Sequence, residues 1–339
     1  MVTARRAGDA ATEAAALVTL ACAEPIGGNV EQIQAVLAQA RAVASRVSAS
    51  EPFLAAAIAE SETLKYAGLH EQAATVAREG LAAAGEYGLA RTYGAVLAGS
   101  LAEPLLSLGR WDEANEIIEG ALQLFPLQLD RTCLWRLAGD IALARGDLVA
   151  AAESVASIKS VLDHARYQSQ YHLPLIRLES QVRLSQGGRA QALSVIHDAL
   201  DRFDVRQSPR HAWPLLVAGT RACAAAAAYR TLLPEAGAML DRLRAEAGMP
   251  AAEGAAQRAH QLTTVVLAWP DDISRAEPDL DAVRGIVARR IARTATRLED
   301  TYGPPRSPEC RSRAEPPTAG GQPRRTRQIG GYGSQSGLG

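Results

Sequence analysis

Aromatic side chains and long apolar runs are scarce in this chain. Only 4% of its 339 residues are Phe, Trp or Tyr, although 47% are hydrophobic. Alanine supplies most of the apolar content, so we expect helices that pack closely and leave few bulky pockets. No apolar run approaches the roughly 20 residues of a transmembrane helix, and Met1 to Arg6 lead into an alanine-rich amphipathic segment that lacks the leucine-rich core of a signal peptide. A cytoplasmic protein that does not enter the membrane is therefore predicted.

A surplus of charge is missing too, and cysteines are few. The 36 basic and 37 acidic residues give a net charge of -1, which does not fit a general nucleic-acid binder, because neutralising phosphates requires an excess of Lys and Arg. The four cysteines, Cys22, Cys133, Cys223 and Cys310, lie far apart and form no CxxC pair. This spacing argues against a disulfide framework or a zinc module and predicts free, buried thiols.

The sequence contains no pattern typical of catalysis. It has no GxSxG, and the paired acids Asp271 and Asp272 are better explained by a solvated turn. Its histidines do not group with acids or cysteines at metal-ligand spacing, as a metal site would require; they are His70, His164, His172, His197, His211 and His260. We therefore predict a non-enzymatic protein with no metal and no cofactor.

Helical periodicity is strongest between residues 80 and 126. Apolar residues recur at steps of three and four on both sides of a short turn at 108–112, so each side predicts an amphipathic helix. The first ladder is Tyr93, Val96, Leu97, Leu101, Leu105 and Leu108, and the second is Ala114, Ile117, Ile118, Ala121, Leu122 and Phe125. Two such stripes can be buried only against each other and against further hairpins.

The turn of this hairpin repeats along the chain. A G-x-x-x-x-A motif begins at Gly68, Gly109, Gly146 and Gly187, at intervals of 41, 37 and 41 residues. We expect the glycine to end a first helix in the left-handed conformation. The alanine five residues later is small enough to let the second helix lie close to the first. Polar residues after the glycine, such as Asp112, Glu113 and Asp147, suit the positive end of the second helix dipole.

These repeats predict an all-α fold, a tetratricopeptide-like superhelix of helical hairpins, since the period lies between about 34 and about 47 residues. A degenerate earlier copy is expected at Gly27-Gly28 with a helix over 30–47, and a decayed later copy near 231–244. We place the array at residues 1–262 and a degenerate helical segment at 263–301. The Arg/Pro/Gly-rich tail at 302–339 is predicted to be disordered from its composition.

Four segments together resemble the helical-repeat region of large ATP-binding LuxR-type regulators, also called MalT-like and found in actinobacteria. In chain order they begin REGLAAAGEYGLARTYGAV at Arg78, RLAGDIALARGDLVAAAESV at Arg136, YHLPLIRLESQVRLSQGGRAQAL at Tyr171 and PRHAWPLLVAGTRACA at Pro209. The resemblance covers about residues 10–262. It implies an array that senses an effector or a partner between an ATP-binding module and a DNA-binding helix-turn-helix.

The chain departs from that plan at both ends. It has no G-x-x-x-x-G-K-[ST] phosphate cradle and no helix-turn-helix pattern, so neither ATPase activity nor operator binding carries over. The ladders also give way abruptly to WPDDISRAEPDL and the Arg/Pro/Gly tail. We therefore expect a truncated or split regulator, with a frameshift near 263–269 as the hypothesis for the change in composition.

The leading interpretation is the sensor and interaction section of such a regulator. It would bind a protein or small-molecule effector in a groove, could also self-associate, and would touch DNA only indirectly through the missing module. A free-standing tetratricopeptide-like adaptor with no transcriptional role and a helical domain serving a neighbouring enzyme are the alternatives. Because first helices line the concave face of such arrays, we predict Arg91, Tyr93, Ser100 and Glu103 as binding residues. The competing interpretation is that Tyr93 belongs to the core and the polar residues are only solvated.

Overall fold

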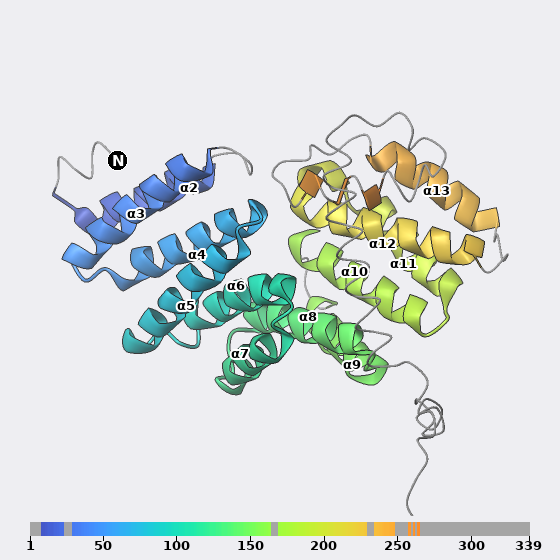
Figure 1. Ribbon diagram of the computed structural model, residues 1–339, viewed down its shortest axis with the longest axis horizontal. Coiled ribbons are helices and arrows are strands. Elements are labelled where there is room, and N and C mark those ends of the chain that lie inside the picture. The colour runs from blue at the N-terminus through green and yellow to red at the C-terminus, as the bar shows by residue number, and fades with distance from the viewer. Residues whose placement is uncertain are drawn as a thin grey trace, which may run out of the picture. The chain divides into compact units, whose positions relative to one another are not determined.

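The computed structural model describes residues 8–23, 29–163, 169–228 and 234–247, with 257–258, 260–261 and 263–264 (Figure 1). In this part of the chain the helices follow one another with no strand between them. The elements are α2 (Ala10–Ala23), α3 (Val30–Arg46), α4 (Ser50–Tyr66), α5 (His70–Glu86), α6 (Tyr93–Leu108), α7 (Trp111–Gln123), α8 (Gln128–Arg145), α9 (Leu148–Leu162), α10 (Ser169–Ser185), α11 (Arg189–Arg202), η1 (Val205–Gln207), α12 (Pro209–Ala228) and α13 (Pro234–Ala247). The predicted all-α class is confirmed.

These helices all belong to the first of two compact units of the chain, Met1–Val283. The second unit, Arg284–Gly339, lies outside the described residues. The predicted tail at 302–339, nearly all of the segment at 263–301 and the Gly27-Gly28 turn lie outside them as well.

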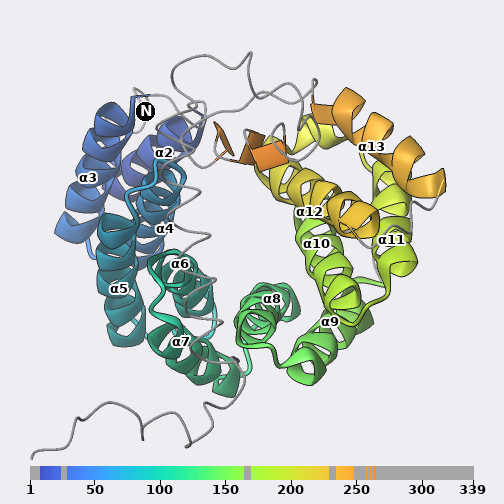
Figure 2. The ribbon, with the colours of Figure 1, turned by 45° about the vertical axis from the view of Figure 1, so that its right-hand side comes forward.

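The helices pair into hairpins, each with a first helix (α2, α4, α6, α8, α10 and α12) and a second helix (α3, α5, α7, α9, α11 and α13). Each first helix packs against its own second helix and also against the next first helix along the chain. Each second helix also packs against the next first helix, most extensively α5 against α6. Stacking of each first helix on both helices of the preceding hairpin produces the predicted superhelical array, whose inner side the first helices line (Figure 2).

The repeated glycines end first helices as predicted. Gly109 and Gly146 have φ angles of 79° and 80° and cap α6 and α8 in the left-handed conformation, which a side chain disfavours and glycine adopts freely. Gly68 and Gly187 have φ angles of 83° and 84° at the equivalent places. On the other side of the turn, the side chain of Asp147 accepts a hydrogen bond from the amide of Ala150 and caps α9.

The alanine of the motif is buried in every copy: Ala73, Ala114, Ala151 and Ala192 have no exposed surface. Opposite it, seven residues before the turn glycine, the first helix carries only small side chains, which are Ser61, Ala102, Gly139 and Ser180. The hydroxyl groups of Ser61 and Ser180 donate to the carbonyls of Ala73 and Ala192, each at 3.0 Å. Small side chains on both helices therefore bring the two backbones close.

Two sequence expectations are wrong in detail. Phe125 is 72% exposed, because α7 ends at Gln123 and Phe125 adopts a φ of 51° in the following loop; the apolar ladder stops with the helix. Of the described cysteines, which are all free, only Cys223 is buried, whereas Cys22 and Cys133 are exposed. None of the described helices combines the length and the apolar character needed to span a membrane.

Candidate binding surface on the first helices

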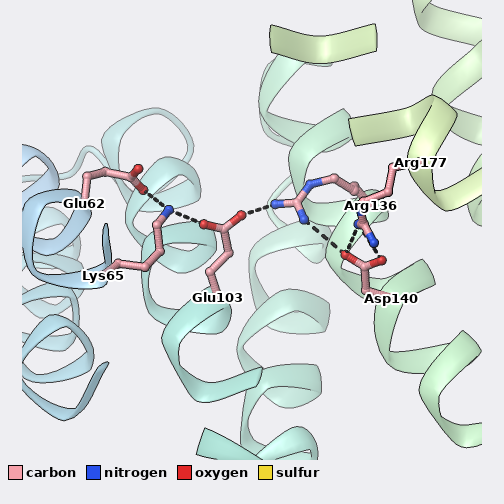
Figure 3. A network of polar contacts seen from close by, with 6 residues as sticks. All are labelled: Glu62, Lys65, Glu103, Arg136, Asp140 and Arg177. Atoms are coloured by element: carbon pink, nitrogen blue, oxygen red, sulfur yellow. Dashed lines mark hydrogen bonds and ion pairs between the residues drawn. The ribbon is translucent and has the colours of Figure 1, made fainter. Parts of the chain in front are cut away.

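Four successive first helices carry a row of alternating charges, which we call the charged strip (Figure 3). It consists of Glu62 and Lys65 on α4, Glu103 on α6, Arg136 and Asp140 on α8, and Arg177 on α10. The side chains are partly buried, with exposed fractions between 13% and 29%. The strip crosses three helix–helix contacts, α4 with α6, α6 with α8 and α8 with α10, and so links four successive hairpins.

Each acid in the middle of the strip binds a base on either side. Glu103 forms ion pairs with Lys65 of α4 and with Arg136 of α8. Asp140 accepts from Nη1 of Arg136 at 3.1 Å, and both of its oxygens accept from Nη2 of Arg177 at 2.7 Å. At the first end of the strip, Nζ of Lys65 donates to Glu62 Oε1 at 2.8 Å.

The repeat register places these groups side by side. Glu62, Glu103 and Asp140 each stand six residues before a turn glycine, and Gln181 holds the same position in the next hairpin. Arg136 and Arg177 each stand ten residues before the glycine, one helical turn away on the same face. Nη1 of Arg177 donates to Gln181 at 2.8 Å, so the amide continues the pattern where the acids end.

Electrostatics holds Glu103 and Lys65 in their charged forms. Burial alone would raise the pKa of the Glu103 carboxyl, but the adjacent Lys65 and Arg136 outweigh burial and hold that pKa well below its usual range. Burial would likewise lower the pKa of Lys65, and the carboxylates of Glu103 and Glu62 raise it above its ordinary value instead. Arranged in this way the strip is a fixed array of charges whose side chains remain partly exposed.

The beginning of α12 lies against the same surface. The guanidinium carbon of Arg210 is 5.1 Å from the ring centroid of Tyr66, at the end of α4. Next to it, burial and the positive charges of Arg210 and Arg136 lower the pKa of His211 to about 4, while Glu103 acts in the opposite direction. His211 is therefore neutral near pH 7 and adds no charge to the strip.

Of the four residues predicted from the sequence, Glu103 lies in the middle of the strip. Ser100 is buried, and its carbonyl is 3.4 Å from the hydroxyl of Ser61. Tyr93 is partly buried against the core that contains Leu97. Arg91 is exposed and donates to the carbonyl of Phe125 at 2.9 Å, in the loop between α7 and α8. The structure thus spreads the four residues over different surroundings.

Sequence reasoning missed Glu62, Lys65, Arg136, Asp140 and Arg177, and for all of them except Lys65 the sequence held a signal. The signal was present in the recurrence of acids six residues, and arginines ten residues, before the turn glycine. A comparison of the hairpins position by position would have shown it.

A small hollow adjoins the strip between α8, α9 and α10. Its lining mixes polar and apolar groups, among them Thr132, Cys133, Arg136, Gln170, Tyr171 and Pro174. It adds an uncharged area next to Arg136. In the described part of the chain, no three His, Cys, Asp or Glu side chains are grouped as a metal site would require.

No protein-family model matches the chain, and no curated protein matches it.

Proposed function

We propose that the chain is an interaction module that binds an effector or protein partner on its first helices. The charged strip is the observation that carries this proposal. Ion pairs on an unselected surface contribute little to stability, about 0–1 kcal/mol each, yet here they recur at one register position in successive hairpins. An ordered row of charged groups is suited to a ligand that follows the array from hairpin to hairpin.

Within this proposal, we assign the chain to the sensor and interaction section of a LuxR-type, MalT-like transcriptional regulator in the cytoplasm. The order of the four resembling segments supports this assignment. The chain acts without catalysis and reaches DNA only through a module that it does not contain. A free-standing tetratricopeptide-like adaptor is the second candidate, favoured by the lack of both a phosphate cradle and a helix-turn-helix pattern.

Gene context separates the two candidates. A neighbouring frame that encodes a P-loop or a helix-turn-helix favours the regulator, and downstream helical repeat in another frame supports the frameshift hypothesis. Sequence-selective promoter binding by this chain alone, measured by electrophoretic shift, would contradict a reading in which the DNA-binding module is absent.

The role of the first helices is tested with two exposed valines. Val96 on α6 is 37% exposed and stands two helical turns before Glu103, whereas Val149 on the second helix α9 is 71% exposed. The probe is the protein encoded by the neighbouring frame, titrated calorimetrically. We expect Val96→Glu to weaken binding about tenfold, which corresponds to about 1.4 kcal/mol, and Val149→Glu to leave it unchanged. Equal affinities for the two variants would refute binding on the first helices.

A further inference from the structure

The contact between α12 and α4 differs in range from the other polar contacts of the array. Tyr66 and Arg210 are 144 positions apart in the sequence, whereas the ion pairs between the described helices join residues at most 41 positions apart. An array in which each repeat touches only its neighbours has no need of such a contact. Arg210 of α12 therefore covers the ring of Tyr66 on α4, a helix that is not its neighbour in the array.

That place has the chemistry of a guanidinium site. The Tyr66 ring presents a π face, and the ammonium of Lys65 lies 4.7 Å from its centroid. The same ammonium forms ion pairs with the carboxylates of Glu62 and Glu103. Burial raises the pKa of the Tyr66 hydroxyl, Lys65 and Arg210 lower it, and the two carboxylates raise it. The π face itself attracts a further cation, arginine more often than lysine.

Arg210 is held there in a way that allows exchange. Arg210 is exposed to solvent, and it lies in the first turn of α12. A cation over an aromatic ring at an exposed position is favoured only about two- to fivefold. A second guanidinium that brings contacts of its own can therefore replace it.

We propose that Tyr66, with Glu62 and Glu103 beside it, is a subsite for an arginine side chain of a partner polypeptide, and that Arg210 fills this subsite until the partner arrives. The inference rests on the proposed function, because it deepens the binding surface of the first helices. A polypeptide is the occupant rather than a free amino acid, since the charged strip continues from this subsite across α6, α8 and α10. Arg210 then acts as an internal competitor that sets the affinity for the arginine.

The experiment vacates the subsite in the full chain. Arg210→Ala is titrated with the blocked tripeptide acetyl-Gly-Arg-Gly-amide, and the same peptide with citrulline serves as the neutral control of equal shape. We expect Arg210→Ala to bind the arginine peptide about three- to sixfold more tightly than the unaltered chain, because it removes an internal competitor of that strength, and the citrulline peptide to give no saturable signal. Equal affinity of Arg210→Ala and the unaltered chain would overturn the role of Arg210 as the resident occupant.

Variants of the ring identify the subsite. In the Arg210→Ala background, Tyr66→Phe keeps the π face and is expected to leave the affinity unchanged, whereas Tyr66→Leu is expected to lose about two- to fivefold. Arginine-peptide binding that is unaffected by Tyr66→Leu would place it elsewhere and refute the proposal. The valine pair Val96 and Val149 tests the wider binding surface independently, so failure of the arginine subsite and failure of the proposed function give different results.

Discussion

Gly139 is the position where one added methyl group should perturb the packing most directly. A Cβ built there would lie 2.7 Å from Cδ2 of Leu178 on α10 and 3.0 Å from Cβ of Ser154 on α9. Leu178 has no exposed surface and so little room to move. Overpacking of this kind costs about 1–3 kcal/mol, against a gain of about 1 kcal/mol when alanine replaces glycine inside a helix.

Gly120 on α7 provides the matched control, because a Cβ there would meet nothing within 4 Å. Gly120→Ala should therefore stabilise the array by about 0.5–1 kcal/mol. The same substitution at Gly139 is expected to be neutral or to destabilise by up to about 2 kcal/mol, the difference between its two opposing terms. The contrast between the two variants isolates the overpacking, since both gain the same helix propensity.

Thermal and urea denaturation measure this contrast. For an array of this size, 1 kcal/mol corresponds to a shift in Tm of about 2–4 °C. Because long arrays lose two-state behaviour, hydrogen exchange of α8 amides should accompany the denaturation curves. A Gly139→Ala protein as stable as Gly120→Ala would refute the close approach of α8, α9 and α10, and with it the spacing on which the Asp140–Arg177 ion pairs depend.

Two further predictions concern the charged strip. Glu103→Gln leaves Lys65 and Arg136 facing each other and should cost about 1–3 kcal/mol of unfolding free energy, between the values for exposed and buried pairs, while Glu116→Gln on α7 should cost little. The pKa of Glu103 is lowered in the folded state. The stability that Glu103 contributes is therefore present above the ordinary pKa of glutamate and is lost as pH falls through the folded-state pKa. The difference in urea midpoint between the unaltered chain and Glu103→Gln should shrink in acid, and a constant difference would contradict this. His211, with a folded pKa of about 4, binds its proton more readily when unfolded, so stability should fall as pH drops from about 6.5 toward 4. His211→Gln should flatten that part of the pH profile, and an unchanged slope would show that His211 is not buried against the strip.

Much of the fold followed from local rules that the chain obeys in the four hairpins with a G-x-x-x-x-A turn. A left-handed glycine and a buried alanine five residues later are properties of a single turn, so Gly109 and Ala114 could be predicted without knowing what surrounds them. Phe125 shows where that reasoning stopped: periodicity counted it with α7, but the helix ended two residues earlier. An apolar periodicity shows which residues would lie on one face of a helix, but it does not show at which residue the helix ends.

The binding surface was harder to predict, because its contacts join different hairpins. Glu103 was placed on the inner side from its position on a first helix, yet its partners lie 38 residues before and 33 residues after it. The sequence of one hairpin does not show that Lys65, Glu103 and Arg136 are in contact. Only a comparison of hairpins indicates such contacts, because an acid recurs six residues before the turn glycine.

Measured from that glycine, the first helix has two separate tasks on adjacent positions. The residue seven before it is small and faces the second helix, where Ser61 and Ser180 bond to the motif alanines. The residue six before it is acidic or an amide and faces the next first helix, as Glu103 and Asp140 do. Neighbouring positions on a helix point about 100° apart, so one can change without disturbing the other. The close packing of each hairpin can therefore stay constant while the position that faces the next first helix varies, which is the condition for an array to keep its fold and alter what it binds.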